Sequence, residues 1–215
     1  MFVKTFLKSS SRSKLKKIFG FFLLLNPYLY WKYIDLESKK KKFDFLIQDK
    51  FLIKTLHELE DINTIFEFGC GFGDRLYNIK KEFGIDLTLD GFDINQKRIQ
   101  KGSELLLNNN IDGILLSTKE NKNKYDIVFT SMTLIYFNEK QIIEILKKLI
   151  NKTNKYLILQ EVCSFSKMHK STLFAHNYFE ILKKLDLKNF KFDKIPNPNW
   201  ERGKDVYGVN IIISL

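Results

Sequence analysis

Short apolar runs alternate with amphipathic segments along most of this 215-residue chain. The short runs are rich in β-branched and aromatic residues, whereas the longer segments repeat their apolar residues at helical spacing. Parallel strands need a crossover, which is usually a helix, so the alternation predicts a mainly parallel sheet with helices on both faces. We expect strands at 64–68, 87–92, 113–116, 125–130 and 156–161, and helices at 43–59, 75–83, 96–107, 139–150 and 173–185.

The last two apolar runs, at 190–195 and 206–214, have no helical segment between them. They are therefore expected to pair as a hairpin, which makes the final strand antiparallel. The expected architecture is an α/β fold, doubly wound, with a mainly parallel seven-stranded sheet and added N-terminal helices. We expect one domain over 43–215, preceded by a separate basic and apolar segment at 1–42.

A glycine-rich turn follows the first expected strand and precedes a helix. It begins at Glu67 and contains Gly69, Gly71 and Gly73, which allow a sharp turn and close approach of a ligand. The spacing G-x-G-x-G differs from the dinucleotide fingerprint G-x-G-x-x-G. Glu67 would repel a pyrophosphate, but it can accept hydrogen bonds from an amino group. Asp93 ends the second strand, where an acid can bind both ribose hydroxyls of an adenosine.

The run 66–73 resembles motif I of the class I S-adenosylmethionine-dependent methyltransferases. Residues 91–94 look like the second motif of that family, 125–131 like its fourth strand and following loop, and 156–161 like its fifth strand. The closing hairpin fits as well, because the family ends on an antiparallel seventh strand inserted beside the sixth. The resemblance covers about residues 60–215 and implies a Rossmann-like fold, methyltransferase activity and S-adenosylmethionine as cofactor.

The resemblance also implies roles for individual residues. Glu67 would lie near the methionine amino group, Asp93 would bind the ribose hydroxyls, and Ile94 would pack on the adenine. Many members carry an acid after the third strand that contacts the adenine; here 117–120 leave Ser117, Thr118 and Glu120 as alternatives. The implied cofactor-binding residues are Glu67, Gly69, Cys70, Gly71, Gly73, Asp93, Ile94, Ser131 and Met132.

Several classes of acceptor are disfavoured by the residues that come after the fourth strand. Nucleobase amino-group methylases that resemble this family carry Asn/Asp-Pro-Pro-aromatic there, whereas residues 130–133 read Thr-Ser-Met-Thr. Cytosine-C5 enzymes of the RNA type need a Pro-Cys pair at that point, so we interpret Cys163 as a packed residue rather than a nucleophile. Catechol-type transfer needs clustered carboxylates there, and this stretch has none, so we expect no metal ion.

A hydroxyl acceptor needs a general base, and imidazole is suited to that role near neutral pH. Two of the three histidines, His169 and His176, follow the fifth strand and are the candidate catalytic residues. The favoured hypothesis is in-line methyl transfer to a small-molecule or glycan hydroxyl. The alternatives are a tRNA or rRNA methyltransferase with a basic N-terminal arm, and a non-catalytic module with a methyltransferase-like fold.

The N-terminal segment holds most of the net charge. Residues 1–42 contain eleven basic and two acidic residues, which is +9 of the total +11. Only four of the 36 basic residues are arginines, which weakens a nucleic-acid interpretation because arginine makes the bidentate contacts. A lysine-rich stretch is followed by the apolar run 18–25 and by four aromatic residues.

Three interpretations of this segment remain: a helix that covers the cofactor pocket, a basic arm for RNA, and a peripheral membrane contact. An apolar run beside lysines and aromatic residues is typical of a membrane interface. We therefore expect a cytoplasmic protein whose residues 1–34 contact the inner face of the membrane, where a lipid-linked glycan would be the acceptor. Two cysteines exclude a disulfide framework and suit a reducing compartment.

Overall fold

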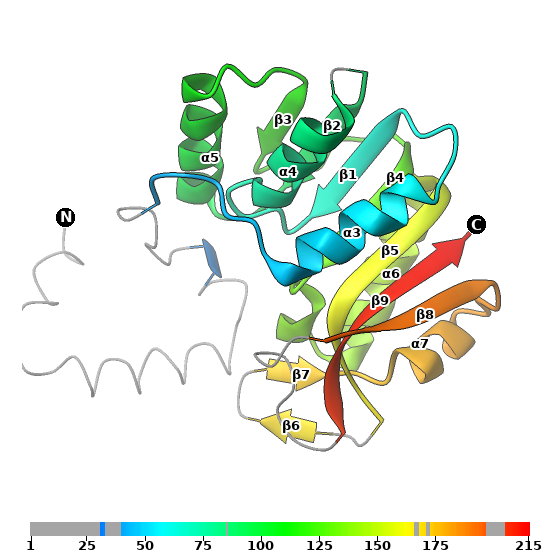
Figure 1. Ribbon diagram of the computed structural model, residues 1–215. Helices are drawn as coiled ribbons and strands as arrows, with labels where there is room; N and C mark the ends of the chain where they lie inside the picture. Colours follow the sequence, from blue (N-terminus) through cyan, green and yellow to red (C-terminus); the bar gives the residue numbers. More distant parts are fainter. Residues whose placement is uncertain (1–30, 33–39, 85, 166–167, 171–172, 197–204) are drawn as a thin grey trace, which may run out of the picture.

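The computed structural model describes residues 31–32, 40–84, 86–165, 168–170, 173–196 and 205–215 (Figure 1). Within them, a seven-stranded sheet has the order β3-β2-β1-β4-β5-β9-β8. Its first five strands are mutually parallel, and β9 is antiparallel to both of its neighbours. The strands are β1 (Thr64–Phe68), β2 (Thr88–Phe92), β3 (Ile114–Ser117), β4 (Tyr125–Ser131), β5 (Thr153–Ser164), β8 (Phe190–Ile195) and β9 (Val206–Ser214). The predicted doubly wound sheet and its closing hairpin are confirmed.

Helices cover both faces of the sheet. On one face α3 (Ile47–His57), α4 (Asp74–Phe83) and α5 (Gln96–Asn108) share an apolar core with the sheet. On the other face α6 (Glu139–Lys152) and α7 (Tyr178–Lys184) form a second core. Three of these helices are the crossovers between parallel strands: α4 joins β1 to β2, α5 joins β2 to β3, and α6 joins β4 to β5.

The central strands are apolar on both faces, which explains their unbroken apolar sequence. In β4, Val128 packs in the core beneath α6 and α7, whereas its neighbours Ile127 and Phe129 pack in the core beneath α3, α4 and α5. All three are fully buried. Successive side chains of a strand point to opposite faces, so a strand between two helical layers needs apolar residues at every position.

One predicted element is wrong. The expected helix at 173–185 begins only at Tyr178, because the Asn177 side chain accepts a hydrogen bond from the Glu180 amide and so caps the helix there. The preceding stretch is strand β7 (Leu173–Ala175), which pairs with β6 (Met168–Lys170) in a separate two-stranded sheet. The apolar residues of this stretch do not distinguish a strand from the start of a helix.

The helix expected at 43–59 is shorter as well, because α3 begins at Ile47. Its Asp49 side chain accepts a hydrogen bond from the Leu46 amide, which fixes the start of the helix. No helix in the described part of the chain combines the length and apolar character that crossing a bilayer requires.

Candidate functional site

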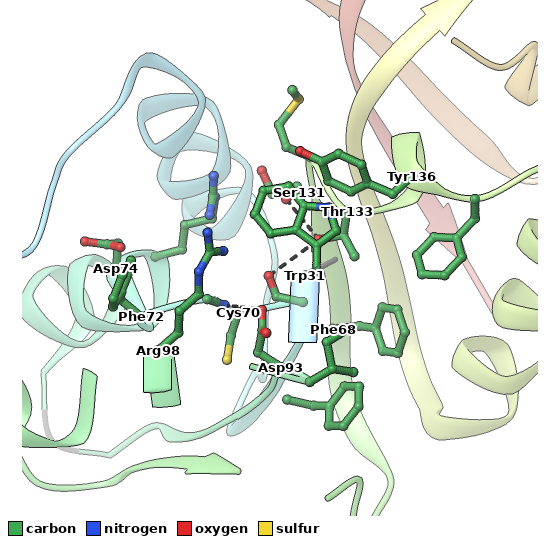
Figure 2. A pocket seen from close by; sticks show the side chains of 17 residues that line it. Trp31, Phe68, Cys70, Phe72, Asp74, Asp93, Arg98, Ser131, Thr133 and Tyr136 are labelled. Atoms are coloured by element: carbon green, nitrogen blue, oxygen red, sulfur yellow. Dashed lines mark hydrogen bonds between the residues drawn. The ribbon is translucent and has the colours of Figure 1, made fainter. Parts of the chain in front are cut away.

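A cavity of about 280 Å³ lies at the carboxyl ends of β1, β2 and β4 (Figure 2). This is the edge of the sheet where open α/β folds bind ligands. Seven of the nine residues implied by the methyltransferase resemblance line it, whereas Glu67 and Gly73 do not. The seven are Gly69, Cys70, Gly71, Asp93, Ile94, Ser131 and Met132.

The turn after β1 is held against the end of β2. The amides of Gly69 and Cys70 both donate to the Phe92 carbonyl, at 2.7 and 2.9 Å. Gly69 has φ +82°, and a Cβ there would lie 2.2 Å from Thr133 Oγ1 on the loop after β4. Both the backbone conformation and the close approach of Thr133 therefore require glycine at this position.

At Gly71 a side chain would fill ligand space rather than clash with the protein. Its φ is +58°, yet a Cβ there would meet only Arg98 Nη1, at 3.8 Å. A side chain at position 71 would therefore project into the cavity rather than against the rest of the fold. Such a bare backbone surface allows a ligand to approach the turn closely.

The Asp93 carboxylate lies at the floor of the cavity and is 9% exposed. Its Oδ2 accepts from the Gly71 amide at 2.9 Å, and its Oδ1 accepts from the Asn95 amide at 2.8 Å. These bonds orient the carboxylate and leave each oxygen a further lone pair for a ligand. This arrangement fits the ribose of S-adenosylmethionine, because a carboxylate with two free lone pairs can accept from two hydroxyls.

The Glu67 carboxyl is completely buried beneath the turn. Its Oε1 lies 3.5 Å from Arg75 Nη1, and its Oε2 has no hydrogen-bond partner among the described residues. Burial raises the pKa of Glu67 to about 8, although the Arg75 guanidinium opposes the shift. A buried carboxyl with an unused oxygen fits the amino group of a bound methionine portion, which would stabilise the ionised form.

Two arginines that sequence reasoning missed also line the cavity. Arg75 Nε lies 3.5 Å from Asp49 Oδ1, so Arg75 joins two buried acids. The Arg98 guanidinium lies 4.7 Å from the Trp31 ring and 5.4 Å from the Phe72 ring. These are two of only four arginines in the chain, and that rarity is the one sequence signal that could have marked them.

Trp31 comes from far away in the sequence to line the same cavity. Its carbonyl accepts a hydrogen bond from Asn95 Nδ2 at 2.7 Å, and its ring centroid lies 4.7 Å from that of Tyr136. Figure 2 shows the indole standing over the cavity between Asp93 and the loop that carries Thr133. This position agrees with the lid interpretation for residue 31, whereas 1–30 and 33–39 lie outside the described residues.

The loop after β4 is fixed by a second buried carboxyl. Glu161 Oε1 accepts from the amides of Thr133 and Leu134, at 3.0 and 3.1 Å. These amides open the short 3₁₀ helix η3 (Leu134–Tyr136). Burial raises the pKa of Glu161 to about 7, and the two amide bonds oppose the shift. Glu161 thus positions the part of the cavity wall that faces Trp31.

Of the two candidate bases, His176 lies outside the cavity. His176 is buried, with its ring between those of Phe174 and Tyr178, and it does not line the cavity. His169 lies in β6, on the small sheet that comes after β5. Their catalytic role stays a prediction. Cys163 is fully buried, and burial raises the pKa of its thiol.

Sequence comparison finds no matching family model and no curated relative. Solved structures do match. Magnesium protoporphyrin IX methyltransferase from Synechocystis, with bound S-adenosylmethionine, has a TM-score of 0.60 at 14% identity, over 92% of this chain and 96% of that chain. Geranyl diphosphate C-methyltransferase from Streptomyces coelicolor, with S-adenosylhomocysteine, has a TM-score of 0.64 at 11% identity, over 89% and 97%. Mitomycin 7-O-methyltransferase has a TM-score of 0.55 at 13% identity, over 78% and 53%.

This is the class I S-adenosylmethionine-dependent methyltransferase fold. The antiparallel last strand β9 is inserted beside β8, between β5 and β8, as the sequence resemblance implied. At 10–14% identity the likeness establishes the fold. The chemistry depends on the residues that line the cavity.

Proposed function

We propose that this protein is a methyltransferase that uses S-adenosylmethionine. The observation that carries the proposal is the orientation of the Asp93 carboxylate. It accepts hydrogen bonds from the Gly71 and Asn95 amides, and its remaining lone pairs are available to a ligand in the cavity. It stands at the end of β2, beside a turn whose glycines have positive φ. A dinucleotide pyrophosphate is disfavoured here, because the turn has the glycine spacing G-x-G-x-G rather than G-x-G-x-x-G.

S-adenosylmethionine supplies an electrophilic methyl group on a positively charged sulfur. The protein has to hold the cofactor, align the acceptor with the methyl carbon and exclude water. Asp93 would hold the ribose, the Gly69–Gly73 turn would lie along the methionine portion, and Glu67 would meet the amino group. Trp31 and Tyr136 would cover the cavity, and their rings would limit the access of water to it.

We further propose that the acceptor is a hydroxyl of a small molecule or glycan. The cavity wall near the loop after β4 is aromatic, with Tyr136, Phe137 and Trp31, and such walls suit an uncharged organic acceptor. The structural neighbours are named for small-molecule acceptors, among them a porphyrin and geranyl diphosphate. A hydroxyl acceptor would use His169 or His176 as its base, and His176 would first have to move so that its imidazole reaches the cavity.

Cofactor-dependent labelling tests the proposed acceptor. A cell extract is incubated with the protein and S-adenosylmethionine labelled in its methyl group, and lipid, glycan, RNA and protein fractions are counted. We expect label in the small-molecule, glycan or lipid-linked fraction. Label confined to RNA would instead support the alternative of an RNA methyltransferase with a basic N-terminal arm.

The histidine hypothesis has its own test. His169→Gln and His176→Gln are compared with the wild type for turnover and for cofactor affinity. A base is needed for the chemical step alone, so the critical variant should lose turnover, about 10²-fold or more, and keep its cofactor affinity. Turnover unchanged in both variants would exclude both residues as the base.

For residues 1–34 we propose peripheral contact with the inner face of the cytoplasmic membrane, where a lipid-linked acceptor would be presented. The support is the sequence itself, in which lysines precede the apolar run 18–25. Replacement of Lys14, Lys16 and Lys17 by glutamine in the full chain should reduce sedimentation with anionic vesicles. Unchanged sedimentation would remove this segment as a membrane contact.

A further inference from the structure

A second basic surface lies outside the cofactor cavity, between the start of α3 and the side of α4. A groove of about 920 Å³ runs between these two helices, beside the segment that leads into α3. Five exposed lysines line it, and they come from three parts of the chain. They are Lys41, Lys42, Lys50, Lys54 and Lys81.

The positive charge of this groove is not balanced by nearby acids. None of the five lysines forms an ion pair with another described residue. Glu82 is the one acid that lines the groove, and its carboxylate lies 3.0 Å from His57 Nε2. Asp44, on the same segment, is already paired with Lys40. The groove therefore presents several lysine ammonium groups to a partner.

Three consecutive large apolar side chains stand exposed beside these lysines. Phe45, Leu46 and Ile47 are 53%, 47% and 40% exposed, and they are three of the seven exposed large apolar residues in the described part of the chain. Ile47, Lys50 and Lys54 follow one another at helical spacing, so they share one side of α3. Apolar and basic groups thus form a single continuous surface.

We propose that this surface, formed by residues 41–54 and Lys81, binds the headgroups and acyl boundary of an anionic lipid bilayer. Lysines beside exposed apolar side chains match a membrane interface, where the ammonium groups meet anionic headgroups and the apolar groups enter the acyl boundary. A nucleic acid would use the lysines alone and would leave Leu46 and Ile47 in contact with charged phosphates.

The proposed surface is directly connected to the cofactor cavity. Lys40 Nζ lies 2.7 Å from Asp74 Oδ1 and 5.2 Å from the centroid of the Phe72 ring, and Asp74 and Phe72 both line the cavity. The amide of Asp44 also donates to Asp74 Oδ1, at 2.7 Å. Contact of residues 41–47 with a bilayer would therefore hold the cavity close to the lipid surface. This inference goes beyond the proposed function, because it needs neither the cofactor nor residues 1–34.

The test is sedimentation of the full chain with vesicles of phosphatidylcholine alone and with vesicles that also contain 30% phosphatidylglycerol. The double variant Lys50→Gln/Lys54→Gln, on α3, is compared with the control double variant Lys147→Gln/Lys148→Gln. Both double variants remove two exposed charges, and the second pair lies on α6, on the other face of the sheet. A lysine at an anionic surface contributes about fivefold to partitioning, so the α3 variant should bind about 25-fold more weakly and the α6 variant about as tightly as the wild type.

A second variant tests the apolar part of the surface. Phe45→Ser/Ile47→Ser should weaken binding to the anionic vesicles even in 0.5 M salt, where the contribution of the lysines is screened. The control Leu107→Ser, at an exposed site on α5, should leave binding unchanged. Equal binding of the α3 and α6 lysine variants would overturn the proposal. Binding of RNA that falls in the α3 variant, without vesicle binding in the wild type, would overturn it as well. Methyl transfer to a soluble acceptor is measured separately, so failure of the proposed methyltransferase function can be distinguished from failure of the proposed lipid contact.

Discussion

Alanine at Gly69 should mainly lower stability and alanine at Gly71 should mainly lower cofactor affinity, although both glycines have positive φ in the same turn. An L-residue at such a φ costs about 1–2 kcal/mol. At Gly69 the new Cβ would also lie 2.2 and 2.5 Å from Oγ1 and Cγ2 of Thr133. Forcing a methyl group into a packed site adds about 1–3 kcal/mol. Gly69→Ala should therefore lower the free energy of unfolding by about 2–5 kcal/mol.

Gly71→Ala has only the backbone cost, about 1–2 kcal/mol, because its Cβ meets no protein atom closer than 3.8 Å. Its methyl group would instead occupy ligand space, so cofactor affinity should fall at least about tenfold, and Gly71→Val should abolish binding. Urea unfolding measures the first quantity for both variants, and calorimetric titration with S-adenosylhomocysteine measures the second.

The clash at Gly69 can be relieved in a double variant. Thr133→Ala removes the two atoms at 2.2 and 2.5 Å and leaves its Cβ at 2.9 Å. Gly69→Ala combined with Thr133→Ala should therefore recover about 1 kcal/mol or more relative to the sum of the single changes. Equal destabilisation by Gly69→Ala and Gly71→Ala, or strict additivity with Thr133→Ala, would refute the close approach of the two loops.

Three further predictions concern the cavity. Burial raises the pKa of Glu67 from 4.5 to about 8, so the folded protein holds this proton more tightly than the unfolded chain, and the free energy of unfolding should fall as pH rises from about 5 to 8. Glu67→Gln should flatten that profile in urea unfolding; an unchanged profile would contradict the assignment. A cofactor amino group would favour the ionised carboxyl, so cofactor binding at pH 7 should release a proton in the wild type but not in Glu67→Gln. Calorimetry in buffers of different ionisation enthalpy measures this proton release. Trp31→Ala should weaken cofactor binding by about 1 kcal/mol, because the contact of the indole ring with the ligand is lost. The weakening should show as faster dissociation of the cofactor in stopped-flow measurements. An unchanged dissociation rate would mean that Trp31 does not cover the ligand.

Much of the sheet could be predicted from the sequence, because local signals agree with the fold. The strand β4 was expected at 125–130 and spans Tyr125–Ser131, and the two strands of the hairpin have the expected bounds. Strands buried on both faces are rich in apolar residues, and the glycine turn at 69–73 separates β1 from α4. The same alternation predicts the positions of the glycine turn and of Asp93, because the turn follows the end of β1 and Asp93 follows the end of β2.

The parts that could not be predicted depend on contacts distant in sequence. Trp31 reaches Asn95 across 64 positions, and nothing in its neighbourhood in the sequence indicates that contact. The Arg98 guanidinium lies between the rings of Trp31 and Phe72, so its place in the cavity depends on both. Likewise, the pairing of β7 with β6 and the cap at Asn177 decide the structure of 173–177, where helical spacing alone suggested a helix.

The most direct test of cofactor binding at this cavity is calorimetric titration of the full chain with S-adenosylmethionine and S-adenosylhomocysteine, for the wild type, Asp93→Ala and the exposed control Asp112→Ala. We expect one site in the wild type, unchanged affinity in the control, and binding weaker by about 1.5–3 kcal/mol in Asp93→Ala, where charge-assisted hydrogen bonds to the ribose are lost. A wild type that binds neither compound, as a non-catalytic module would, or an Asp93→Ala variant with wild-type affinity, would contradict the proposed methyltransferase site.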